Sequence, residues 1–276
     1  MSESTAEILA IGSEILAGDV LDTNSHWLCR QLTARGLRVV RITALPDDPD
    51  VISEALRAAL RRGPSLIITC GGLGPTADDL TLAAVAAALG RPLSKDPAAW
   101  EMVRGFYARL YARGKVATPE MTAARGKMAI LPEGSVPLAN VVGAAPGVLL
   151  EEGGTTIACL PGVPAEMKWI FEHSLWPRVA ARLAAQVYVE RIIPTDCHDE
   201  SVMAPAVDLV ASRHPAVYVK SRAQVYGGEA TDFVTLAARA ASAAQAAALL
   251  DAAEADLRQV LAGVGVHTEP AQESIA

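Results

Sequence analysis

The stretch Ser65-Leu-Ile-Ile-Thr-Cys-Gly-Gly-Leu-Gly-Pro-Thr-Ala-Asp-Asp-Leu-Thr81 decides the fold of this chain. Leu66 to Cys70 is short, apolar and partly β-branched, which is typical of a strand covered on both faces in a parallel sheet. The three glycines that follow have no Cβ, so the backbone can adopt positive φ angles and approach a ligand closely. A helix should then run to about Leu89, with Gly90 as its stop signal. Phosphates bind at such loops between a strand and a helix.

Asp78 and Asp79 add negative charge where the sequence predicts a phosphate. The carboxylates would repel a pyrophosphate unless a divalent cation lay between them, and Mg²⁺ is commonly held by carboxylate and phosphate oxygens. In an alternative reading, the two acids only complement the dipole of the helix that follows. Gly72 to Ala77 also matches the dinucleotide fingerprint G-x-G-x-x-A, but the next stretch, Ala98 to Arg113, reads as a helix rather than a second strand.

Acid-bearing loops also follow the two strands predicted earlier in the chain. The strand from Glu7 to Ile11 leads into a loop that contains Glu14, and the strand from Leu37 to Ala44 leads to Asp47. Connections between parallel strands are right-handed, and parallel strands point one way. We therefore expect the loops after these two strands and after Leu66 to Cys70 to meet at one edge of the sheet.

The composition excludes several classes of protein. A formal charge of −7 and only 4% aromatic residues provide neither a basic surface nor a stacking platform for nucleic acid. No window approaches the roughly 18 apolar residues that a membrane span needs. The four cysteines are scattered without metal spacing, so we expect reduced thiols and a cytoplasmic protein. The sequence has no P-loop, no G-x-S-x-G elbow and no H-E-x-x-H motif.

The pattern changes after the first 180 residues, which are predicted to form one α/β domain. Strand-like and helix-like segments from Gln186 onward predict a small α+β domain over residues 185–262. Residues 263–276 have no hydrophobic periodicity, and we expect them to form a mobile tail.

Five motifs in the first domain carry a resemblance to a known family. They are, in order, Gly12-Ser-Glu-Ile-Leu-Ala-Gly18, Asp22-Thr-Asn24, Gly71-Gly-Leu-Gly-Pro-Thr-Ala-Asp-Asp-Leu-Thr81, Asn140-Val-Val-Gly-Ala-Ala-Pro-Gly147 and Leu160-Pro-Gly-Val-Pro-Ala-Glu166. Together they resemble the N-terminal domain of competence/damage-inducible protein A (CinA), within the molybdopterin-binding superfamily of MoaB-like and MogA-like proteins. The resemblance implies a three-layer αβα domain with a mixed, mostly parallel sheet. It also implies a homodimer or another homo-oligomer.

The resemblance implies two classes of function and a set of site residues. In CinA-type proteins this domain is associated with metal-dependent hydrolysis of ADP-ribose-like pyrophosphates, whereas in molybdenum-cofactor proteins the same pocket binds molybdopterin, adenylylates it or passes the product on. Matched by motif, the acids on which those families rely fall at Asp47 and Asp79. The ligand-binding residues fall at Gly71, Gly72, Gly74, Thr76, Asn140, Gly143, Pro161 and Gly162.

We therefore expect a metal-dependent nucleotide pyrophosphatase of the ADP-ribose type. A divalent ion (Mg²⁺, Mn²⁺ or Co²⁺) held by Asp79, with Asp47 or Asp78, would polarise the pyrophosphate and lower the pKa of a bound water. The alternatives are a molybdopterin-binding or adenylyl-transferring protein, and a non-catalytic protein that binds a nucleotide. The chain stops at Ala276, too early for the C-terminal nicotinamide-mononucleotide deamidase domain of full-length CinA proteins, so that activity is not expected.

Overall fold

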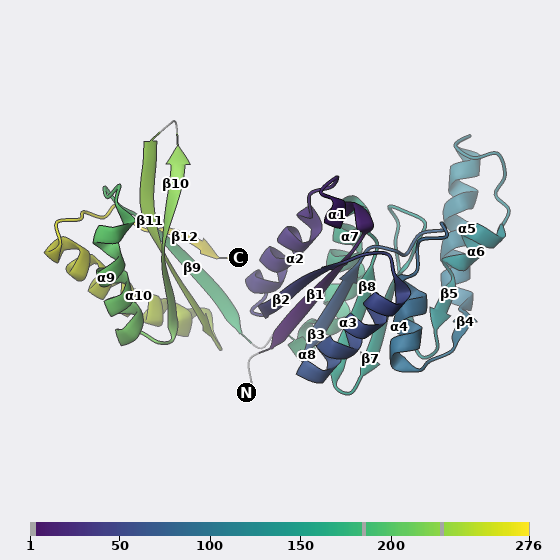
Figure 1. The fold of residues 1–276 in the computed structure, drawn as a ribbon, viewed down its shortest axis with the longest axis horizontal. Coiled ribbons are helices and arrows are strands. Elements are labelled where there is room, and N and C mark those ends of the chain that lie inside the picture. Colours follow the sequence, from purple (N-terminus) through teal and green to yellow (C-terminus); the bar gives the residue numbers. More distant parts are fainter. Residues whose placement is uncertain (1–3, 184–185, 227–228, 276) are drawn as a thin grey trace. The chain divides into compact units, whose positions relative to one another are not determined.

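The computed structural model describes residues 4–183, 186–226 and 229–275 of the chain, which forms two compact units (Figure 1). The first unit comprises described residues 4–30 and 38–183, and the second comprises residues 31–37 together with the described residues from 186 onward. The residues predicted to carry the function lie in the first unit.

Six strands of the first unit form one sheet, in the order β2-β1-β3-β8-β7-β6. Their bounds are β1 Thr5–Ile11, β2 Arg38–Leu45, β3 Leu66–Cys70, β6 Val136–Leu138, β7 Gly147–Glu152 and β8 Thr155–Leu160. Strand β1 pairs in parallel with β2 and β3, and β3 pairs in parallel with β8. Strand β7 runs antiparallel to β8 and β6. The α/β fold with a mixed, mostly parallel sheet is thus confirmed.

Helices of the first unit lie on both faces of this sheet (Figure 1). Their bounds are α1 Ser13–Ala17, α2 Thr23–Ala34, α3 Pro49–Arg62, α4 Thr81–Leu89, α5 Pro97–Ala112, α6 Ala123–Lys127, α7 Pro164–Ile170 and α8 Trp176–Leu183, with a π-helical turn, η1, at Phe171–Leu175. Only residues 23–30 of α2 belong to the first unit. A short antiparallel pair, β4 Leu93–Lys95 and β5 Ile130–Pro132, lies outside the main sheet. Helix α6 ends at Lys127, and β5 begins at Ile130.

The core explains why β3 is apolar at every position except Thr69. All five residues of β3 are buried. Ile67 belongs to the apolar cluster that Ile52 and Leu56 of α3 also join. Because side chains alternate along a strand, Leu66 and Ile68 point to the opposite face, where they are buried too. A strand buried on both faces needs no polar alternation.

The second unit is built around an antiparallel sheet in the order β10-β11-β9-β12. Its elements are β9 Val187–Pro194, α9 Glu200–Arg213, β10 Val217–Tyr226, β11 Glu229–Ala240, α10 Ala243–Gly263 and β12 Gln272–Ile275. Apolar residues of the sheet and of both helices, such as Ile193, Val210, Leu236 and Leu257, form one buried cluster.

Strand β12 lies in the segment for which the sequence indicates no regular element. It pairs antiparallel with β9, from Gln272 opposite Ile192 to Ile275 opposite Val189. The four residues are too few to produce a readable periodicity, and the backbone partner on β9 is distant in sequence. This strand is therefore decided by tertiary pairing rather than by local pattern.

Candidate functional site

A cavity of about 420 Å³ lies at the carboxyl edge of the main sheet. Strands β2, β1, β3 and β8 are neighbours and point the same way, so the loops that follow them meet there. We call this cavity the acidic pocket, and it is lined by Ile11, Gly12, Glu14, Asp47, Gly71, Gly72, Leu73, Gly74, Pro75, Asp78, Asp79, Met128, Ala144, Ala145, Pro161, Gly162, Val163 and Glu166. The acid-bearing loops do gather at one edge, as the sequence predicts.

The glycine loop after β3 depends on two residues with positive φ. Gly71 has φ 116°, and a Cβ there would lie 2.0 Å from the carbonyl oxygen of Ile11. Gly72 has φ 66°, and a Cβ there would lie 2.3 Å from Oγ1 of Thr81. Thr81 Oγ1 in turn donates to the carbonyl oxygen of Gly71 at 2.8 Å. The loop therefore packs against β1 and α4 with no space for a side chain.

Asp78 and Asp79 lie in the loop before α4 and not in its first turn. Helix α4 begins at Thr81. Asp79 Oδ2 accepts hydrogen bonds from the backbone N–H of Thr76 at 2.8 Å and from Thr76 Oγ1 at 2.6 Å. Such local side-chain bonds compete with helical bonds, which explains the later helix start. The two carboxylates therefore lie ahead of α4 and do not open it.

Thr76 also hydrogen-bonds to Asp78. Its single hydroxyl proton is shared between Asp79 Oδ2 and Asp78 Oδ1. This contact and, second, a backbone hydrogen bond lower the pKa of the exposed Asp78 carboxyl. The Asp78 side chain is therefore ionised at neutral pH. Lys127 Nζ donates to the carbonyl oxygen of Thr76, so one cation lies beside this acidic loop. Thr76 itself is absent from the lining of the acidic pocket and acts through the two acids.

Asp47 joins the loop after β2 to the first residue of α1. Its Oδ2 accepts from the backbone N–H of Ser13 at 2.8 Å, and its own backbone N–H donates to Ser13 Oγ at 3.2 Å. The neighbouring Asp48 caps α3 by accepting from the N–H groups of Asp50 and Val51. Of these two acids, only Asp47 lines the pocket.

Asn140 holds Glu166 at the pocket wall. Asn140 is buried, and its Oδ1 accepts from the N–H groups of Val142 at 3.0 Å and Gly143 at 2.9 Å. Its Nδ2 donates to Ala145 O at 2.8 Å and to Glu166 Oε2 at 2.7 Å. A Cβ on Gly143 would lie 1.9 Å from the Glu166 carboxylate. Asn140 and Gly143 do not line the pocket directly. Asn140 fixes the position of Glu166, which does, and Gly143 leaves space for the Glu166 carboxylate.

Pro161 and Gly162 line the pocket and are fixed through their carbonyl groups. Asn24 Nδ2 donates to Gly162 O at 2.7 Å. The Cys70 thiol, at the end of β3, donates to Pro161 O at 3.5 Å. Burial raises the pKa of Cys70 to about 12, so the thiol stays protonated and serves as a donor rather than a nucleophile.

Comparison with known proteins shows the family to which this chain belongs. The sequence model of the family described as "Probable molybdopterin binding domain" matches residues 7–181. The chain belongs to this molybdopterin-binding family. It is 42% identical over 203 residues to a protein of Pyrococcus furiosus, covering 74% of this chain and 79% of that protein. It is 44% identical over 219 residues to a protein of Aeropyrum pernix, covering 79% of each.

A solved structure shows the same relationship. The protein CinA from Thermoplasma acidophilum, described as having unknown function, is 34% identical to this chain with a TM-score of 0.57. The match covers 64% of this chain and 99% of the CinA chain. The resemblance to CinA and to the molybdopterin-binding family that the five motifs indicate is thus confirmed. Separately, no helix in the described part of the chain is both long and apolar enough to cross a membrane.

The acids predicted to hold a divalent metal in this molybdopterin-binding family member do not form a complete metal cage. Among the described residues, no three His, Cys, Asp or Glu side chains are grouped so that they can hold a metal ion. Mg²⁺ is commonly held by one or two carboxylates together with phosphate oxygens of a substrate. Asp47, Asp78 and Asp79 therefore fit a cation only if a phosphate ligand supplies further oxygen ligands.

Glu166 is the pocket acid whose position the sequence interpretation missed. It lies in the first turn of α7, where an acid ordinarily complements the helix dipole. Helix α7 follows β8, however, and β8 ends at the same sheet edge as the acid-bearing loops. The available signal was therefore that Glu166 lies in the first turn of the helix that follows β8, a parallel neighbour of β3.

The pH dependence of the free energy of unfolding should reveal the partly buried Glu166 carboxyl. Burial raises the pKa of Glu166 above its ordinary 4.5, against the opposing hydrogen bond from Asn140. The folded state thus holds the proton more tightly than the unfolded chain, so the stability contributed by Glu166 is full below pH 4.5 and is lost as pH rises through the folded pKa. We expect Glu166→Gln, which stays neutral and keeps an acceptor for Asn140, to gain stability relative to wild type as pH rises across this window.

Urea unfolding of both proteins between about pH 4 and about pH 8 measures this difference. The exposed Glu172→Gln is the control, since it removes a charge at the surface of the same unit. A constant difference between wild type and Glu166→Gln at every pH would contradict the prediction.

Proposed function

We propose that the acidic pocket binds the phosphate group of a pterin or nucleotide, with molybdopterin as the ligand class that the family favours. The observation that carries this proposal is the glycine loop: Gly72, Leu73 and Gly74 line the pocket in succession in the connection between β3 and α4. The N-cap of α4, Leu80, supplies no side-chain cap to the helix. Backbone N–H groups and the positive end of a helix dipole are suitable partners for phosphate oxygens.

The charge of the pocket sets a condition on this ligand. Five acids line it, namely Glu14, Asp47, Asp78, Asp79 and Glu166. Ionised carboxylates that line the same cavity would repel a phosphate that has no cation bound to it. We therefore propose that the phosphate binds together with a divalent cation, such as Mg²⁺, Mn²⁺ or Co²⁺, which Asp79 and Asp47 or Asp78 would hold. The bound cation would supply charge neutralisation and polarisation of the phosphate.

A second candidate function is hydrolysis of a dinucleotide-like pyrophosphate of the ADP-ribose type. The observation that favours it is the ionised and exposed Asp78 beside Asp79, because a carboxylate at the pocket wall can orient an attacking water. Water would add across one P–O–P bond to give two phosphate monoesters, with release of a proton. Asp79 and Asp47 would then be the catalytic carboxylates. Backbone N–H groups of the glycine loop would stabilise charge on the phosphate oxygens.

Asp79→Asn tests both candidates. Asparagine keeps an oxygen that can accept from Thr76, so the loop should retain its shape while the charge is lost. We expect phosphate-ligand binding in the presence of Mg²⁺ to weaken and any AMP release from ADP-ribose, FAD, NAD or ATP to fall by about 100-fold or more. Calorimetry and chromatography measure the two quantities. Glu172→Gln, an exposed change of the same charge, is the control.

Three outcomes separate the candidates. Ligand binding without AMP release supports the binding function and excludes hydrolysis of these substrates. AMP release that survives in Asp79→Asn would contradict the role of that carboxylate. Absence of binding for molybdopterin and for every nucleotide would overturn the proposed function. Light scattering of the same samples tests the homodimer or other homo-oligomer that we also propose for this protein.

A further inference from the structure

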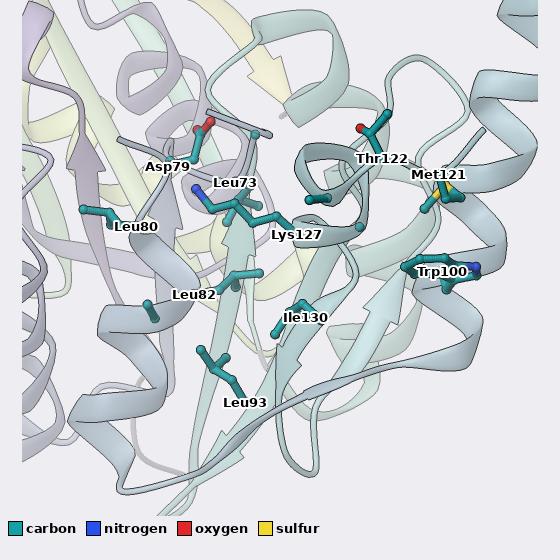
Figure 2. A pocket seen from close by; sticks show the side chains of 15 residues that line it. Leu73, Asp79, Leu80, Leu82, Leu93, Trp100, Met121, Thr122, Lys127 and Ile130 are labelled. Atoms are coloured by element: carbon teal, nitrogen blue, oxygen red, sulfur yellow. The ribbon is translucent and has the colours of Figure 1, made fainter. Parts of the chain in front are cut away.

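A second cavity, of about 490 Å³, adjoins the acidic pocket and shares Gly72, Leu73, Gly74 and Asp79 with it. We call it the Trp100 pocket (Figure 2). Its other lining residues are Leu80, Leu82, Ala83, Leu93, Trp100, Met121, Thr122, Ala123, Gly126, Lys127 and Ile130. The volume lies within the range of small-molecule sites, and the shared residues place its wall against the glycine loop.

The Trp100 pocket differs in chemistry from the acidic pocket. Its lining is mostly aliphatic or aromatic, with polar side chains only at Asp79, Thr122 and Lys127. Figure 2 shows the Lys127 side chain extending toward Asp79, and its Nζ donates to the carbonyl oxygen of Thr76. An apolar cavity with a few placed polar groups suits a flat heteroaromatic ring, whose faces are apolar and whose edges form hydrogen bonds.

The indole of Trp100 is fixed in place before any ligand arrives. Lys95 Nζ lies 3.3 Å from the ring centroid, over one face of the indole. A Cβ on Gly126 would lie 3.0 Å from the ring, so the glycine of α6 lets the indole pack closely against this helix. A ring held in this way loses little rotational freedom when a ligand stacks on it, which favours binding.

We infer that the Trp100 pocket binds the planar ring of the ligand whose phosphate lies in the acidic pocket. This inference rests on the proposed function and narrows its substrate class to phosphate esters or pyrophosphates of a pterin or purine nucleoside. The two cavities are joined along Gly72, Leu73 and Gly74, so one molecule can pass over the loop with its ring on one side and its phosphate on the other. Ring-free sugar phosphates would use only the acidic pocket.

The test compares ligands with and without a ring on variants of the whole chain. Trp100→Leu removes the indole but keeps an apolar side chain, and Met121→Ser is a second, independent change in the same wall. Tyr111→Leu is the matched control, because Tyr111 also lies on α5 but is exposed and does not line the cavity. Calorimetry with Mg²⁺ measures the affinity for AMP, neopterin phosphate, ribose 5-phosphate and inorganic pyrophosphate.

We expect both pocket variants to weaken binding of AMP or neopterin phosphate by about tenfold or more, the usual size of a lost stacking contact. Affinities for ribose 5-phosphate and pyrophosphate should not change, and Tyr111→Leu should behave as wild type. If the affinity for AMP falls more, the ring is a purine; if the affinity for neopterin phosphate falls more, the ring is a pterin. Equal weakening of ring-containing and ring-free ligands, or no weakening of either, overturns the inference.

The proposed function fails in a different way. If wild type binds none of the four ligands, and neither molybdopterin nor any of the nucleotides named above, the acidic pocket is not a phosphate site and both proposals fall. If pyrophosphate binds and Asp79→Asn weakens it, but Trp100→Leu leaves AMP affinity unaltered, only the ring site is overturned.

Discussion

Gly71→Ala should lower the free energy of unfolding by about 4 kcal/mol, as the sum of backbone strain and overpacking. The φ of 116° at this residue is rarely adopted by a residue with a side chain, and the added Cβ would lie 2.0 Å from the carbonyl oxygen of Ile11. That oxygen belongs to the backbone of β1, so it cannot rotate away. Relief requires the loops after β1 and β3 to separate, and these loops form the acidic pocket.

Gly90→Ala is the matched control for this prediction. Gly90 also has a positive φ, of 64°, but a Cβ there would meet nothing within 4 Å. Its replacement should cost only about 1–2 kcal/mol, the price of a left-handed backbone conformation for an L-residue. Urea unfolding of the two variants separates strain from steric overlap. If the two variants lose the same free energy of unfolding, the backbone at Ile11 yields to the added Cβ, and the prediction is wrong.

The sequence predicts the frame of the first unit well because that frame rests on local signals. The apolar run of β3, the glycines after it and the turn at Gly153 and Gly154 each have a short-range signature. Once these strands are parallel neighbours, the meeting of Asp47 and Asp79 at one edge follows from topology alone. The position of the acidic pocket was therefore predictable.

The contacts within the pocket depend on groups that are distant in sequence or on competition between bonds. Asp79 bonds to Thr76 instead of opening α4, and a propensity argument assigns such an acid to the helix. Asn140 and Glu166 are separated by 26 residues and come together only through the packing of α7 beside the loop before β7. The Trp100 pocket has walls from five elements, so no single motif indicates it.

The second large effect concerns the buried carboxylate of Glu7 in β1. Arg62→Met should lower the free energy of unfolding by about 3 kcal/mol, because it leaves the Glu7 carboxylate without its partner. Glu7 lies in β1 with its side chain 1% exposed, and it accepts from Arg62 Nε at 2.7 Å in a two-bond pair. The Arg62 side chain keeps 38% of its surface exposed, so water can partly replace it. We therefore take the lower end of the range for broken buried pairs.

Two further variants show whether burial of the charge causes this loss. Arg104→Met breaks the Glu101–Arg104 pair, in which both side chains are more than half exposed, and should cost less than about 1 kcal/mol. Glu7→Gln combined with Arg62→Met removes the buried charge together with its partner, so this double variant should be more stable than Arg62→Met alone. If the double variant is no more stable, Arg62 acts through the packing of its methylene groups, and the ion pair is not what holds the end of α3 against β1.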